Sequence, residues 1–290
     1  VVTAPEHIVV GAGVQMLLEI LCVLLKGRRT VSFPDGSFIQ GSTVFAAHGY
    51  TVRTRYKDAD IIYVSPSHMN RQGDVMPIQR RLELCAHSAE TGAVVIEDDF
   101  ENDFLYSSTP TPSLYALGSG NVVYMGAFSA LLLPGIRISF MVLSPALAAA
   151  YHQMKDTFAQ TASKTEQIAL CAYLRDGNMK SRTKKIRRLY TGKAKTLCAL
   201  LAKALPDHPV RVGENGLQVQ IETPMLPDSA PFEQAGLALY IVKEKSGKNI
   251  VVVSPSAVPA DRLEEAALAV AAALYKAEEA AKAKQSKDIY

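Results

Sequence analysis

Small residues form a short loop that could bind an anion near the start of the chain. Gly11-Ala12-Gly13 follows the strand pattern of Ile8–Val10 and leads into Val14 and Gln15, which open a helical pattern. Small side chains let backbone N–H groups approach an anion at the positive end of that helix. A dinucleotide fingerprint would need a third glycine where the chain has Met16. The loop therefore predicts a phosphate-type site, with an ordinary tight turn as the alternative.

Acidic residues end another apolar segment. Glu97-Asp98-Asp99 follows the strand pattern Ala93–Ile96. Ligands of open parallel sheets bind beyond the carboxyl ends of the strands, so we expect Asp98 at the binding edge. A carboxylate there can keep a heterocyclic ring nitrogen protonated. A helix cap or a metal site is the alternative, although no histidine or further carboxylate has ligand spacing nearby.

A third stretch carries a serine and an arginine. Ser129 follows the strand pattern Val122–Met125, and Arg137 precedes the strand pattern Ile138–Leu143. Arginine suits a phosphate because its planar fork donates hydrogen bonds in pairs. We expect both side chains to close the anion site from the side opposite the Gly13–Gln15 loop.

The elements that must position these residues alternate between strands and helices. Apolar strands separated by helices indicate a mostly parallel sheet that is covered on both faces. After Pro145 long helical stretches run to about Ala204, with Gly177 and Gly192 as expected weak points. Two further strands and a final helix follow. We expect a large domain over residues 1–175, a connecting helix over 176–205 and a small α+β domain over 206–290.

Composition narrows the class of protein. The chain has 290 residues, of which 48% are hydrophobic, and this suits a globular protein of one large and one smaller domain. A net charge of +3 does not by itself argue for nucleic acid. A basic run from Lys180 to Lys195 is read as the solvated face of a long helix rather than a DNA-facing patch. Dispersed cysteines and no apolar run of membrane-spanning length predict a cytoplasmic protein that does not enter a membrane.

Four segments resemble fold-type I aminotransferases that depend on pyridoxal phosphate. Their order is similar to the aminotransferase-like domain of MocR/GabR-type bacterial transcription regulators. The segments are Gly13-Val14-Gln15, Ser65-Pro66-Ser67-His68 with Gly73, Glu97-Asp98-Asp99-Phe100, and Gly126-Ala127-Phe128-Ser129 with Pro134-Gly135-Ile136-Arg137.

The resemblance implies an α/β fold-type I transferase with pyridoxal phosphate as its coenzyme. Asp98 takes the place of the partner of the pyridine nitrogen, Phe38 that of the stacking aromatic, and Asn70 that of the donor to the phenolic oxygen. Phe100 replaces the usual tyrosine and cannot donate a hydrogen bond. The branch further implies a homodimer, a small amino-acid-like effector, and DNA contact only through an N-terminal winged-helix domain, which these residues do not include.

Two departures from the family concern its chemistry. The residue after Ser129 is the Schiff-base lysine in the family, whereas this chain has Ala130, whose methyl group can neither form an imine nor carry a proton. The strand expected to present an arginine to a substrate carboxylate reads Val251-Val252-Val253. We therefore expect no catalytic residue in the chain as written, and non-covalent binding of the coenzyme.

Three functions remain open from the sequence. The first is the pyridoxal-phosphate- and effector-sensing domain of a MocR-type regulator. The second is an aminotransferase whose active-site lysine was mutated to alanine, so that whether the chain is an enzyme stays undecided. The third is a scaffold that has lost the coenzyme and serves dimer contacts.

Overall fold

The computed structural model describes residues 1–99, 111–118, 120–129, 131–132, 134–158, 161–243 and 247–287. The chain forms two compact units. The described part of the first falls in Val1–Asn70, Val75–Asp103 and Thr109–Lys184. The described part of the second falls in Arg71–Asp74 and Lys185–Tyr290, so a short segment of the N-terminal half belongs to the C-terminal unit.

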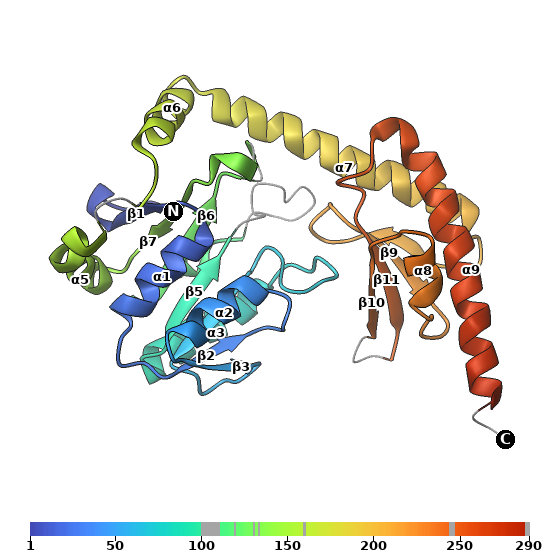
Figure 1. The fold of residues 1–290 in the computed structure, drawn as a ribbon, viewed down its shortest axis with the longest axis horizontal. Helices are drawn as coiled ribbons and strands as arrows, with labels where there is room; N and C mark the ends of the chain where they lie inside the picture. Colours follow the sequence, from blue (N-terminus) through green and yellow to red (C-terminus); the bar gives the residue numbers. More distant parts are fainter. Residues whose placement is uncertain are drawn as a thin grey trace. The chain divides into compact units, whose positions relative to one another are not determined.

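The first unit is built on a seven-stranded sheet with the strand order β1-β7-β6-β5-β4-β2-β3 (Figure 1). Five neighbouring strands of this sheet, β6, β5, β4, β2 and β3, are parallel to one another. Strand β7 is antiparallel to both of its neighbours, β6 and β1. Consequently β1 runs in the same direction as the parallel strands, and its carboxyl end reaches the same edge. The strands are β1 (Ile8–Gly11), β2 (Thr30–Phe33), β3 (Thr51–Thr54), β4 (Ile61–Val64), β5 (Val94–Asp98), β6 (Val122–Ala127) and β7 (Ser139–Val142).

Helices cover both faces of this sheet. On one face α1, α2 and α5 enclose the larger core, in which Leu17, Phe45 and Ala148 are buried. On the other face α3 and α4 pack through Cys85 and Leu114. The helices are α1 (Val14–Leu24), α2 (Ile39–Ala47), α3 (Ile78–Thr91), α4 (Leu114–Leu117), α5 (Pro145–Met154) and α6 (Lys164–Arg175), with short 3-10 turns at η1 (Pro5–His7), η3 (Pro134–Ile136) and η4 (Lys155–Phe158).

The second unit is an antiparallel four-stranded sheet in the order β10-β11-β9-β8, packed against helices on one face. Its core joins Leu201 of the long helix, Phe232 and Leu274 to the inward-facing valines and isoleucine of the sheet. The elements are α7 (Asn178–Ala204), β8 (Val210–Val212), β9 (Val219–Thr223), α8 (Ala230–Gln234), β10 (Tyr240–Lys243), β11 (Asn249–Val253), η5 (Ala260–Arg262) and α9 (Leu263–Lys287).

The fold class predicted from the sequence is confirmed by this mostly parallel sheet with helices on both faces. The break predicted at Gly177 is also confirmed, because this residue has φ +73° and separates α6 from α7. The predicted weak point at Gly192 is wrong, since α7 passes through it without interruption. A helical glycine costs about 1 kcal/mol relative to alanine, and the burial of Thr191 and Ala194 beside it offsets that cost.

Short strands escaped the sequence prediction. The missed strands are β2, β3, β8 and β10, each of three or four residues. Strand β3 is mostly exposed and reads Thr-Val-Arg-Thr, so it offers little apolar pattern to detect. Within the described ranges, every helix is too short or too polar to cross a membrane.

Candidate functional site

The predicted site positions share one edge of the sheet of the first unit. Asp98 ends β5, Ser129 follows β6, and Asn70 lies in the loop that follows β4. Phe38 follows β2 and forms the N-cap of α2, while Gly13 follows β1 and forms the N-cap of α1. Arg137 precedes β7, which runs antiparallel to β6, so the start of β7 lies at this same edge. Phe100 and Ala130 lie outside the described residues.

The anion side of the site is built on the start of α1. Gly13 has φ +95°, a conformation that glycine adopts without strain, and α1 begins there without a side-chain cap. The backbone N–H of Ala12 donates to the carbonyl of Thr161 at 2.7 Å, which holds the loop. The first N–H groups of a helix lack carbonyl partners within that helix. Val14 and Gln15 therefore present donors at its positive end.

An arginine lies directly against this helix start. A β-carbon built on Gly13 would lie 2.4 Å from Arg137 Nη2, so only glycine lets the guanidinium approach so closely. Arg137 is exposed and has φ +46°, an uncommon backbone conformation for a residue with a side chain. Uncommon conformations of this kind cluster at ligand-binding sites. The structure thus brings Gly13 and Arg137 together, an arrangement that would suit a phosphate.

The ring side of the site is built on Asp98. Its carboxylate is buried, with 6% of the residue exposed, and it accepts a hydrogen bond from the hydroxyl of Tyr63 on β4. Burial, together with the Asp98 charge, raises the pKa of Tyr63 well above its ordinary value, so the hydroxyl stays a donor. The ring of Phe38 lies 5.3 Å from that of Tyr63 with a 32° tilt. Phe38, Tyr63 and Asp98 are therefore contiguous.

The neighbouring acids have structural partners. Asp99 accepts hydrogen bonds from Ser67 Oγ and, at 3.0 Å, from Tyr124 Oη. Burial raises its pKa, and the two hydrogen bonds act against that rise. Glu97 is fully buried and accepts from the backbone N–H groups of Leu114 and Tyr115 at 2.9 and 3.0 Å. Glu97 therefore caps α4. A helix cap was the alternative role that the sequence allowed for the acidic run Glu97-Asp98-Asp99.

Sequence reasoning missed Tyr63 and the buried Arg81. Arg81 donates to the carbonyl oxygens of Met76 and Pro112, and its charge acts on both Glu97 and Asp99. Tyr63 pairs with Ile96 in the parallel ladder, so it shares a sheet face with Asp98 two residues further along. Only the register of β4 against β5 shows that Tyr63 lies near Asp98, and the sequence of either strand alone does not show it.

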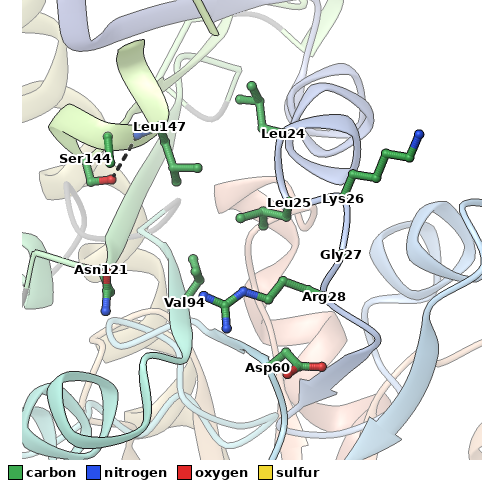
Figure 2. A pocket seen from close by; sticks show the side chains of 11 residues that line it. Leu24, Leu25, Lys26, Gly27, Arg28, Asp60, Val94, Asn121, Ser144 and Leu147 are labelled. Carbon is green, nitrogen blue, oxygen red and sulfur yellow. Dashed lines mark hydrogen bonds between the residues drawn. The ribbon is translucent and has the colours of Figure 1, made fainter. Parts of the chain in front are cut away.

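A cavity lies at the opposite edge of the sheet. Its volume is about 510 Å³, and it lies where β5 and β6 begin, beside Val94 and Asn121. Figure 2 shows Arg28 and Asp60 at its wall and the start of α5 at Ser144 on the other side. The Arg28 guanidinium donates to the carbonyl of Gly92 at 2.9 Å. None of the predicted site residues lines this cavity, so it is separate from the site.

The donors and acceptors at the site fit a phosphate-bearing pyridine. Backbone N–H groups and Arg137 suit a dianion, and a buried carboxylate suits a protonated ring nitrogen. A metal is a poor fit, since the part of the chain that the structure describes gathers no group of three or more histidine, cysteine or acidic side chains.

Comparison with known proteins places the chain in a family. Residues 55–261 match aminotransferase class I and II. The uncharacterized HTH-type transcriptional regulator YdeL of Bacillus subtilis is 30% identical over 87% of this chain and 55% of its own length. The probable rhizopine catabolism regulatory protein MocR of Rhizobium meliloti is 28% identical over 75% of this chain and 47% of its own. The chain thus spans about half the length of these regulators.

Solved structures agree with the fold. LysN, an alpha-aminoadipate aminotransferase of Thermus thermophilus, superposes with a TM-score of 0.74 and 23% identity over 96% of this chain and 79% of its own. Together with the match over residues 55–261, these findings show that the chain belongs to the aminotransferase class I and II family and is homologous to MocR-type regulators.

Proposed function

We propose that the chain is the coenzyme- and effector-binding domain of a MocR-type transcriptional regulator, and that it binds pyridoxal phosphate without transaminating. The family fold implies this coenzyme. The observation that carries the proposal is Ala130, which stands where the resemblance expects the coenzyme lysine. Without an amine at that position, the chain holds the coenzyme by non-covalent contacts alone.

The proposed site residues bind the phosphate and the ring nitrogen of the coenzyme. The α1 N–H groups at Val14 and Gln15, with Arg137 and Ser129, hold the phosphate. Pyridoxal phosphate supplies an electron-withdrawing ring when it is bound. Asp98 keeps the ring nitrogen protonated, and Tyr63 keeps that carboxylate in position through the hydrogen bond described above.

The remaining contacts orient the ring. Phe38 covers a ring face, held by its packing on Tyr63. Asn70 donates to the phenolic oxygen. Phe100 lies next to these acids in the sequence but has no hydroxyl to donate. The phenolic oxygen thus keeps one side-chain donor where the family has two.

The signalling part of the proposal follows from the regulators to which the chain is similar. An amino-acid-like effector binds together with the coenzyme and favours one conformation over another. Two copies of the chain form a homodimer, and a winged-helix domain makes the DNA contacts. The protein acts in the cytoplasm.

Titration of the purified chain with pyridoxal phosphate tests the coenzyme assignment. Calorimetry should show saturable binding near micromolar concentration, and the absorbance band of a lysine-bound coenzyme should not form. Asp98→Asn should weaken binding strongly, because it removes the charge facing the ring nitrogen, whereas Asp58→Asn at an exposed position of the same unit should not. Absence of binding at millimolar coenzyme would favour the scaffold alternative.

Family membership also supports a second candidate, an aminotransferase whose active-site lysine has been replaced. Ala130→Lys separates the two candidates. Transamination of common amino acids by this variant would favour the enzyme. A variant that binds the coenzyme covalently but leaves amino acids unchanged would favour the regulator domain.

A further inference from the structure

The cavity at the amino-terminal edge of the seven-stranded sheet has the size of a small-molecule site. Its volume of about 510 Å³ falls in the range of about 300–1,000 Å³ that is usual for such sites. Its walls come from the end of α1, the starts of β5 and β6 and the start of α5 (Figure 2). Every lining residue belongs to the first unit, so one compact body forms the cavity.

Arg28 presents an oriented cation to this cavity. Gly27 has φ +108°, which turns the chain after α1, and the backbone N–H of Arg28 donates to the carbonyl of Leu25 at 3.0 Å. The guanidinium extends from this turn into the cavity, and its Nη2 donates to the carbonyl of Gly92 at 2.9 Å. A guanidinium has five N–H donors, so this bond orients the group and leaves donors for a ligand. Such orientation before binding lowers the entropy cost of binding.

The charges of the lining favour a ligand with one negative charge. Lys26 and Arg28 are its basic residues, and Asp60 is its acid. The backbone N–H groups of Arg29 and Thr30 donate to Asp60 Oδ2 at 2.8 and 2.9 Å. These hydrogen bonds, above all the one from Arg29, lower the pKa of Asp60, so this carboxylate stays ionised at neutral pH. One positive charge therefore remains for a ligand to neutralise.

The rest of the lining combines an amide with apolar side chains. Asn121, at the start of β6, offers N–H donors from its side chain. Leu25 and Val94 are each only 5% exposed, and Leu147 is half-buried. Ser144 Oγ accepts from the N–H of Leu147 at 3.4 Å, so this hydroxyl caps α5. A ligand in the cavity thus meets a cation, an amide and an apolar surface.

We propose that this cavity binds a small monocarboxylate with an apolar tail, and that Arg28 receives the carboxylate. A guanidinium edge matches a carboxylate with two parallel hydrogen bonds. The Asn121 amide donates to the same group, and the tail packs on Leu25, Val94 and Leu147, which removes apolar surface from water. A dianion such as phosphate would exceed the single positive charge of the lining. The inference is independent of coenzyme binding.

Two pairs of probe compounds test this assignment. They are 4-phenylbutyrate with 4-phenylbutanamide, and hexanoate with hexanamide, so that each pair differs in the charge of one terminal group. Inorganic phosphate is the third probe, an anion without a tail. Arg28→Gln removes the cation, and Arg29→Gln is the matched control, because Arg29 is the next residue and is exposed but does not line the cavity.

NMR titration of the isotopically labelled chain reports both the affinity and the place of binding. The Asn121 side-chain amide and the Gly27 N–H should shift saturably with either carboxylate, with a Kd on the order of 1 mM for probes of this size. The N–H signals of Gly13 and Val14 should stay unshifted. Each carboxylate should bind about 10-fold more tightly than its amide. Arg28→Gln should abolish that preference and keep the affinity for the amides, whereas Arg29→Gln should retain it.

Several results would overturn the inference, and those on the unaltered chain do not depend on how the variants fold. Absence of saturable shifts with both carboxylates at about 10 mM would remove the site. Shifts at Gly13 and Val14 without a shift at Asn121 would place the anion at the start of α1 instead. Equal affinity for acid and amide, or an equal loss of preference in both variants, would exclude the role of Arg28. Tighter binding of inorganic phosphate at Asn121 than of either carboxylate would exclude the proposed class of ligand.

Discussion

Replacing Gly13 by alanine places a methyl group where the guanidinium of Arg137 lies. The new β-carbon would be 2.4 Å from Nη2 and 3.1 Å from Cζ, so the guanidinium has to move. The backbone at Gly13 has φ 95° and ψ 166°, a region open almost only to glycine. Holding alanine there costs about 1–3 kcal/mol of folding free energy.

The larger expected effect is on coenzyme affinity. A hydrogen bond to a charged group contributes about 1.5–3 kcal/mol, and Gly13→Ala should remove the one that Arg137 makes to the phosphate. This corresponds to an affinity for pyridoxal phosphate that is weaker by about 10- to 150-fold. Binding should not vanish, since the N–H groups of Val14 and Gln15 remain at the helix start.

Calorimetry with pyridoxal phosphate and urea unfolding should be carried out on the same preparations. Gly49→Ala is the matched control, because Gly49 has φ +82° and a β-carbon there would meet no atom within 4 Å. It should lose a similar amount of stability while its affinity stays within about twofold of the unaltered chain. An unchanged affinity in Gly13→Ala, or an equal loss in Gly49→Ala, would refute the assignment of Gly13 and Arg137 to the phosphate.

Three further predictions concern the packing and charge of the fold. Tyr63→Phe leaves the buried Asp98 without its hydroxyl donor and should lower the free energy of unfolding by about 1–3 kcal/mol in urea titrations. Burial raises the pKa of Glu97 to about 7 from an ordinary value of 4.5, so the folded chain binds this proton more tightly than the unfolded chain. The free energy of unfolding should therefore fall by about 3 kcal/mol as pH rises from about 4.5 to 7 and then level off, and Glu97→Gln should remove that slope; an unchanged slope would contradict the assignment. Phe232→Ala, at 1% exposure, should cost about 3–5 kcal/mol, whereas Leu268→Ala, at 60% exposure, should have little effect in the same assay.

Local sequence patterns predicted that Gly13, Asp98 and Ser129 follow strands, whereas Phe38 and Asn70 were assigned through the family resemblance. The strand predicted over Ala93–Ile96 is β5, which begins at Val94 and extends two residues further than predicted, to Asp98. The small residues Gly11-Ala12-Gly13 after an apolar strand predicted a loop, and the helical pattern after them predicted the helix that begins at Val14. Because parallel strands end at one edge of a sheet, these separate patterns predicted one shared site.

Partners that depend on the register between strands could not be predicted in this way. The hydrogen bond from Tyr63 to Asp98 requires the alignment of β4 with β5, which no local pattern encodes. The reversed direction of β7 is equally hidden, since a short buried strand reads the same in either orientation. The stacking of Arg71 on Tyr240 joins residues far apart in the chain. The assignments of the site residues to the coenzyme remain predictions.

The pairing of β1 with β7 has a consequence for the order of events during synthesis. Ile8 pairs with Val142, and Ala12 is held by Thr161, so the loop at Gly13 has no fixed partner until the ribosome has released that distant part of the chain. At about 5–20 residues per second, the delay is on the order of ten seconds. Strands β4 and β5 leave the ribosome earlier than β7 and can pair before the loop at Gly13 is held in place. We therefore expect the nascent chain to acquire the ring side of the site before the phosphate side, and a chain that stops short of β7 should fail to retain the coenzyme.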